Sequence, residues 1–189
     1  VFNEGSQDLD FRVESDSNTH RLFVDAGNDK VLVGSSAARE QASVTPAFQI
    51  EGTDFNSSSL GLVSNSNTSV GAFLLIAHNR GTSVGSSTAA NNGDRVGGIF
   101  FQAGDGTDIN SAVAYIEANI YGDVGSNDTP GLLKFGTTAD GSASPTERMA
   151  ILPSGGLTFN GDRSTANALD DYEEGTWTPG SLTGTIGTI

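Results

Sequence analysis

The chain has 189 residues, a formal net charge of −14 and no cysteine, which excludes disulfides and thiolate metal sites. The negative charge would repel nucleic-acid phosphates and anionic lipids, and no apolar run is long enough for a membrane helix, so we expect neither nucleic-acid binding nor membrane insertion. Only 35% of the residues are hydrophobic and 25 are glycine, which predicts a thin core in each protomer and an obligate oligomer.

Residues 1–46 are predicted to form an N-terminal β stem and linker. Phe11 and Val13 alternate with charged residues, and two further short apolar runs, 22–24 and 31–33, flank a turn. A lone hairpin of this size is marginal in water, so we expect copies of the chain to associate through this region. Residues 35–46 are expected to be a polar linker, in which one helical turn at 37–41 is an option.

Residues 47–147 are predicted to form an antiparallel β-sandwich, a jelly-roll-like knob. Its first strands are expected at 48–50, 60–63 and 70–77, and the last of these is the longest apolar run and is predicted to be the most buried. Four more strands are expected near 96–102, 112–121, 132–135 and 149–152. Short strands at this spacing, separated by Gly, Asn and Asp, are typical of all-β domains.

Residues 148–189 are predicted to form a distal β stem and a joint to a further C-terminal part that is missing from this chain. The stretch 148–161 repeats the pattern of 21–34: an arginine, an apolar run, a turn, a second apolar run and a closing glycine. We therefore expect the same hairpin unit in both places. Two copies are too few to indicate a solenoid.

Three segments carry a family resemblance. Gly131–Ile151, with Thr-Thr-Ala-Asp-Gly and Ser-Pro-Thr-Glu-Arg-Met-Ala-Ile, resembles a repeat of the tail fibres and related appendages of tailed bacteriophages. Asp10–Asp29 and Leu169–Pro179, with Asp-Asp-Tyr-Glu-Glu-Gly-Thr-Trp-Thr-Pro, are similar to the same group. The resemblance implies a parallel homotrimeric fibre on the virion, with intertwined stems.

The acidic residues are candidates for glycan cleavage, which uses paired carboxylates. Five aspartates lie in Gly- and Asn-rich stretches, where hydrogen bonding to turn amides is the favoured role: Asp105, Asp108, Asp123, Asp128 and Asp140. A solvated joint is favoured over a cation site for Asp170, Asp171, Glu173 and Glu174. His20 and His78 lack zinc-ligand spacing. We therefore predict no catalytic residue, no metal and no cofactor.

Receptor contact is predicted for the loop 78–94, the longest stretch without apolar periodicity. Loops longer than about 12–15 residues in a compact domain are often functional, and rigid β-scaffolds commonly present recognition residues on loops. The polar side chains proposed for this role are Asn79, Arg80, Asn91, Asn92 and Asp94. Trp177 and the tyrosines could stack on sugars, but anchoring and packing are favoured for them.

These observations favour a structural, non-enzymatic virion fibre protein, a phage tail fibre segment that acts in host attachment. Its expected partners are copies of itself, other virion proteins and a host cell-surface glycan, and its expected location is the surface of the particle. Two alternatives stay open: a glycan-degrading tail spike, and a head or collar fibre with no receptor role.

Overall fold

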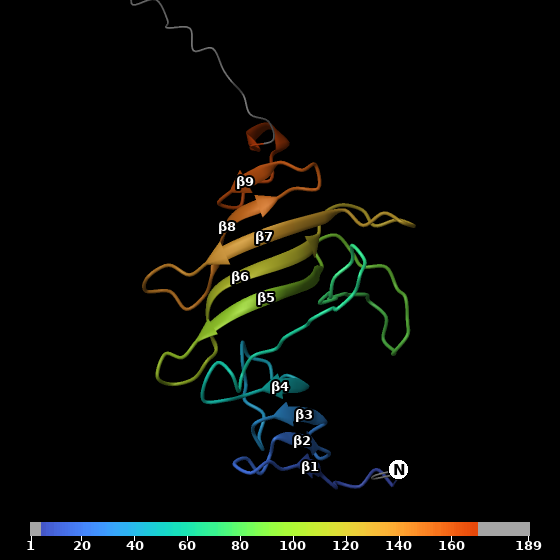
Figure 1. The fold of residues 1–189 in the computed structure, drawn as a ribbon. Helices are drawn as coiled ribbons and strands as arrows, with labels where there is room; N and C mark the ends of the chain where they lie inside the picture. Colours follow the sequence, from blue (N-terminus) through green and yellow to red (C-terminus); the bar gives the residue numbers. More distant parts are fainter. Residues whose placement is uncertain (1–4, 170–189) are drawn as a thin grey trace, which may run out of the picture.

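The computed structural model describes residues 5–169, and within them the chain is all-β, with two sheets and no α-helix (Figure 1). The first sheet has the order β1-β2-β3-β4, with strands β1 (Phe11–Val13), β2 (Leu22–Asp25), β3 (Lys30–Val33) and β4 (Phe48–Ile50). The second has the order β5-β6-β7-β8-β9, with β5 (Arg95–Ala103), β6 (Ser111–Ile120), β7 (Gly131–Thr137), β8 (Thr146–Ile151) and β9 (Leu157–Phe159). A 3-10 turn at Thr165–Asn167 follows β9.

The first sheet combines an antiparallel meander with one parallel strand. β1, β2 and β3 pair antiparallel, and β4 lies parallel to β3, with Val31 opposite Phe48. The prediction that Phe48–Ile50 opens the second sheet is therefore wrong. The connection from β3 to β4 is irregular, and in place of a helical turn Gln41 and Val44 form an isolated β-bridge. A parallel pair needs such a long crossover, because its strands must start at the same end.

The hairpin repeat predicted from the sequence is confirmed. β2–β3 and β8–β9 are antiparallel hairpins in the two matching segments. Gly34 and Gly161, the closing glycines, have φ values of 92° and 84°, a left-handed region that glycine enters without steric cost. The domain boundaries drawn at 46/47 and 147/148 stay predictions.

The second sheet is a continuous antiparallel meander, which confirms the four strands predicted near 96–102, 112–121, 132–135 and 149–152. All of its strands lie in one layer in sequence order, β5 at one edge and β9 at the other (Figure 1). The jelly-roll-like sandwich predicted for the knob stays a prediction for the assembled protein.

The two faces of the second sheet differ sharply in composition. Cross-strand partners share a face and successive residues alternate, so the register assigns each side chain to one face. One face, here called the apolar face, consists of Ile99, Phe101, Ile116, Ala118, Leu133, Phe135, Met149, Ile151, Leu157 and Phe159. Of these residues Ile99, Phe101 and Phe159 are exposed and the others are half-buried, while Ile120, on the same face at the end of β6, is buried. The sheet therefore leaves its most hydrophobic side only partly covered.

The opposite face, here called the polar face, holds the small core of the sheet. Leu132 and Ala150 are buried there with Leu152, and Ala168 from the 3-10 turn packs against them. Glu117 is also buried, and Tyr115 lies so close to Gly136 that a Cβ there would be 2.3 Å from its ring. Among the described residues after β9, Ala168 thus helps to cover the polar face.

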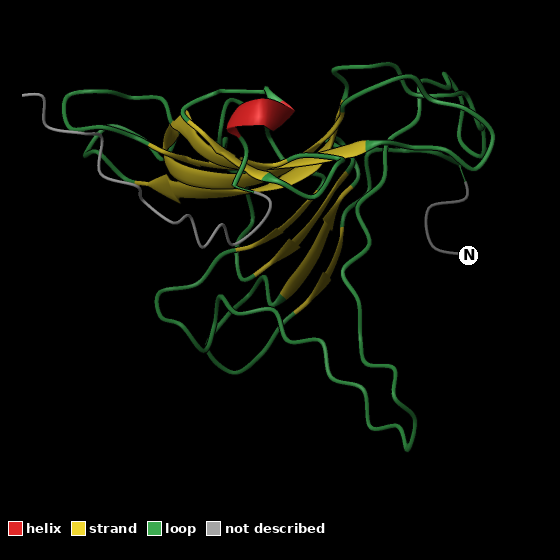
Figure 2. Ribbon diagram, turned by 90° about the horizontal axis from the view of Figure 1, so that it is seen from above, coloured by secondary structure: helices red, strands yellow, loops and turns green. Residues whose placement is uncertain are grey.

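Between β4 and β5 the chain runs from the first sheet to the flank of the second without any strand (Figure 1). The strands predicted at 60–63 and 70–77 are therefore wrong. The run predicted to be the most buried is instead exposed, with Phe73 at 68% and Leu75 at 86%. Long loops of this kind project well beyond the strands (Figure 2). We call residues 55–76 the arm.

Candidate functional site

The loop predicted to contact a receptor is closed at its base by an ion pair. Arg80 donates from Nε to Asp94 Oδ2 at 2.7 Å and from Nη2 to Oδ1 at 2.6 Å. The Arg80 guanidinium, and next the backbone N–H of Asn91, hold the pKa of Asp94 well below its usual range. The same contact raises the pKa of Arg80. Both groups are therefore charged at any physiological pH, and the pair holds the two ends of the loop together.

The other two predicted residues orient the backbone around the ion pair. Asn79 Oδ1 accepts a hydrogen bond from the Gly81 N–H at 2.7 Å, and Asn92 Oδ1 accepts one from the Gly122 N–H at 3.0 Å. The Ile120 N–H donates to the Asp94 carbonyl at 2.9 Å, which fixes the end of the loop to β6. The structure thus brings Arg80, Asn91 and Asp94 together, while Asn79 and Asn92 hold turns. Receptor binding by these five residues stays a prediction.

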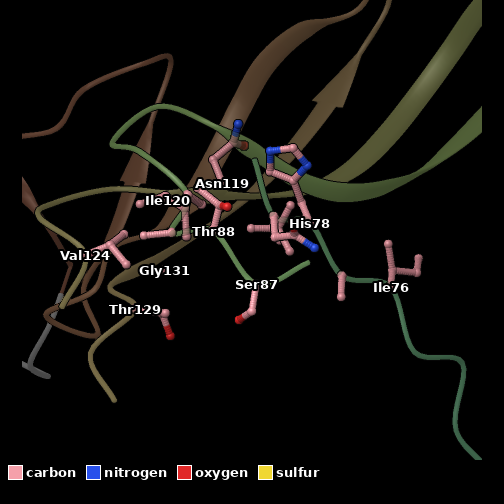
Figure 3. A pocket seen from close by; sticks show the side chains of 15 residues that line it. Ile76, His78, Ser87, Thr88, Asn119, Ile120, Val124, Thr129 and Gly131 are labelled. Atoms are coloured by element: carbon pink, nitrogen blue, oxygen red, sulfur yellow. The ribbon is translucent and has the colours of Figure 1, made fainter. Parts of the chain in front are cut away.

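A pocket of about 480 Å³ lies between this loop and the sheet (Figure 3). Its lining is mainly apolar, with side chains from the end of the arm, from β6 and from the start of β7. Ile76, His78, Ser87, Thr88, Asn119, Ile120, Val124, Thr129 and Gly131 are labelled in Figure 3. The Oδ1 atom of Asn119 is buried and has no hydrogen-bond partner among the described residues. Asn119 was not among the residues predicted from the sequence, although a polar amide side chain inside the apolar strand Ser111–Ile120 indicates a residue with a special role.

Two of the five turn aspartates, Asp105 and Asp108, bond turn amides as the sequence predicted. Asp105 accepts hydrogen bonds from the N–H groups of Thr107 at 2.8 Å and Asp108 at 3.2 Å, which lower its pKa. Asp108 accepts one from the Asn110 N–H at 2.8 Å. These carboxylates stabilise turns. Their hydrogen bonds explain why aspartate occurs at these positions without any catalytic role.

Sequence reasoning also missed a buried ionic cluster on the polar face. Glu117, which is 4% exposed, pairs through one carboxylate oxygen with Arg95 Nε at 2.6 Å and through the other with Lys134 Nζ at 2.6 Å. Burial, followed by the negative charge of Glu147, raises the pKa of the neighbouring Tyr115. The Glu117 carboxylate is enclosed by its two cations, so we assign it a structural role. A single glutamate within a strand of alanines and isoleucines was the available signal.

Within residues 5–169 no group of three or more His, Asp or Glu side chains is arranged to hold a metal ion. No helix in that part of the chain is long and apolar enough to cross a membrane. The acidic joint at Asp170, Asp171, Glu173 and Glu174 lies outside the described residues, as do Tyr172 and Trp177.

Neither a protein-family model nor a curated protein matches this sequence. Among solved structures, the fold is that of a phage tail-fibre domain. The similar structure is the carboxy-terminal domain of the bacteriophage T5 L-shaped tail fibre, with a TM-score of 0.55 and 17% sequence identity over 89% of this chain and 67% of that one. At this identity the likeness concerns the fold, and at that level it confirms the resemblance to tail fibres noted in the sequence.

Proposed function

We propose that this protein is a segment of a phage tail fibre, a structural virion protein that forms a parallel homotrimer and acts in attachment to the host surface. The observation that carries the proposal is the partly exposed apolar face of the second sheet, in a chain whose fold is similar to that of a tail-fibre domain. A contiguous apolar surface of this kind marks an interaction site in soluble proteins. A fibre built from several copies would cover it.

The accessible surface supports association. It is 14121 Å² for the chain, whereas a compact monomer of 19.4 kDa would expose about 8,500 Å². Residues 1–4 and 170–189 could add at most about 3,600 Å², the value for an unfolded chain of their length. At least about 2,000 Å² of excess then belongs to the described residues, which is the scale of an obligate interface.

In this proposal the attachment surface is the loop 78–94, and the chain has no catalytic function. The base of the loop is held by the Arg80–Asp94 pair and by hydrogen bonds to β6, so the loop is presented in one conformation to a host glycan. Three copies on one fibre would add avidity to weak contacts. Other virion proteins would anchor the fibre to the particle.

Sedimentation velocity of the purified chain tests the assembly, and the expected species has about three times the chain mass of 19.4 kDa. A binding assay on arrayed bacterial surface polysaccharides tests attachment, with an Arg80→Ala, Asp94→Ala variant as the matched control. Release of new reducing ends from any bound polysaccharide would favour the tail-spike alternative instead. Labelling the chain on intact particles distinguishes a tail fibre from a head or collar fibre.

A further inference from the structure

We propose that the arm of one copy lies on the apolar face of the second sheet of a neighbouring copy. This inference rests on the proposed homotrimer and specifies how its interface is built. It assigns two surfaces to each other: residues 55–75, which leave the body of their own chain, and the uncovered face around Ile99, Phe101 and Phe159.

The apolar face is the surface that we expect to receive the arm. On this face the edge strand β5 presents Ile99 and Phe101, which are 46% and 50% exposed, and Phe159 at the other edge is 51% exposed. β5 also pairs with only one strand, so one edge of its backbone has no partner strand in the second sheet. An uncovered apolar edge strand would aggregate unless a specific partner covers it.

The arm has the exposed apolar side chains that such a surface would bind. Its large side chains are exposed along the whole segment, from Phe55 at 77% and Val63 at 80% to Leu75 at 86%. Apart from a turn at residues 55–57, no backbone–backbone hydrogen bond is found from residue 58 to residue 79 among the described residues. The arm therefore has exposed apolar side chains that the apolar face of another copy can cover.

The end of the arm is fixed to its own sheet at one point. Ile76 packs onto Gly97 of β5 so closely that a Cβ on that glycine would lie 2.1 Å from the Ile76 Cγ2 atom. Gly97 pairs with Ala118, which places this contact on the apolar face. The residues before Ile76, from Phe73 to Leu75, remain exposed. The last residue of the arm therefore contacts the apolar face of its own chain, and the exposed residues before it do not cover that face.

Charge favours a second copy as the occupant. Residues 55–76 contain no Asp, Glu, Lys or Arg, although the chain carries a net charge of −14, and none of the ten residues that define the apolar face is charged. Copies with this net charge repel one another, so they can approach closely only where both surfaces are neutral. The arm and the apolar face are two such surfaces within one chain.

The dimensions also match. Five strands at about 4.8 Å spacing make a face roughly 19 Å wide, and six extended residues at about 3.3 Å each span the same distance. Val70–Leu75 is a stretch of that length.

Cysteine cross-linking tests the pairing cleanly because the chain has no cysteine of its own. Two differently tagged chains, one with Leu74→Cys and the other with Phe101→Cys, are co-expressed and treated with a short bismaleimide. We expect a covalent product that contains both tags. The matched control replaces Leu74→Cys by Val84→Cys, because Val84 is fully exposed and lies outside both surfaces, and this pair should give no such product.

The result is read together with sedimentation of the same samples. A trimer that yields no mixed product above the Val84→Cys control overturns the arm assignment and leaves the proposed fibre intact. A trimer in which Phe101→Cys links mainly to itself also overturns it, because the apolar faces would then pack on one another. A monomer overturns both the proposed trimer and this inference.

Discussion

Truncation of one side chain on the apolar face should weaken the assembly by a predictable amount. Phe101 is 50% exposed in the single chain, so about 100 Å² of its surface is available for burial by a neighbour. At roughly 25 cal/mol per Å², Phe101→Ala would remove about 2.5 kcal/mol for each protomer. Over three copies the loss is about 7 kcal/mol, or about 10⁵-fold in the trimer association constant.

Sedimentation equilibrium over a dilution series measures this loss. Because three chains dissociate together, the concentration at half dissociation varies as the square root of the constant and should rise about 300-fold. Val84→Ala is the control, since its side chain is exposed and lies off the face, and it should leave the midpoint unchanged. Equal midpoints for Phe101→Ala and the native chain would refute the argument that this face is buried between copies.

Four other outcomes follow from the structure. Glu117→Gln leaves two cations without their buried partner, so denaturant unfolding at fixed protein concentration should show a loss of about 3 kcal/mol. The Arg80 partner lowers the pKa of Asp94 in the folded loop. The ion pair therefore stabilises the loop fully above about pH 4, and this stabilisation is lost only as the pH falls through the lowered pKa of the folded state. Asp94→Asn should therefore open the loop at neutral pH, seen as faster hydrogen exchange at the Asn91 amide, whereas the native loop should stay closed down to about pH 4. Gly97→Ala should displace Ile76 and release the end of the arm, so limited chymotrypsin digestion should cut the arm faster than in the native chain. Added salt should strengthen the trimer, because it screens repulsion between the charged bodies and leaves the neutral contact unaffected; weaker association in salt would contradict a neutral interface.

The strands of the second sheet were predictable because their signal is local. Each apolar run between 95 and 151 alternates over a few residues and is bounded by Gly, Asp or Pro, and each became a strand. The placement of Phe48–Ile50 was not predictable in this way. Its partner, Lys30–Val33, lies across an irregular crossover, and local pattern does not say which of two sheets a short strand joins.

The arm shows a different limit of sequence reasoning. An apolar run such as 70–77 indicates that these side chains need to be covered, and we predicted a buried strand on that basis. Hydropathy does not say whether the cover comes from the same chain. In the single chain the run is exposed and has no strand partner, so its apolar side chains are not buried within one copy.

The candidate site was predicted in part. Arg80 and Asp94 were chosen only as polar residues in a long loop, and the structure adds that they neutralise each other at its base. Asn119 and Glu117 were missed because each was treated as part of an apolar strand. A polar residue inside such a strand is costly to bury without a partner, so it should have been examined as a separate feature.

The two faces of the second sheet together explain the unusual composition of the chain. The polar face is largely covered within the chain: Glu117 is paired with two cations, and Ala168, after β9, packs on the small core. The apolar face has no such cover, although it carries most of the large hydrophobic side chains of the sheet. A chain with 35% hydrophobic residues can support a stable fold in this arrangement, because each copy needs to build only half of its core. In the proposed trimer the other half would form between copies, so folding of the sheet and assembly would be one process.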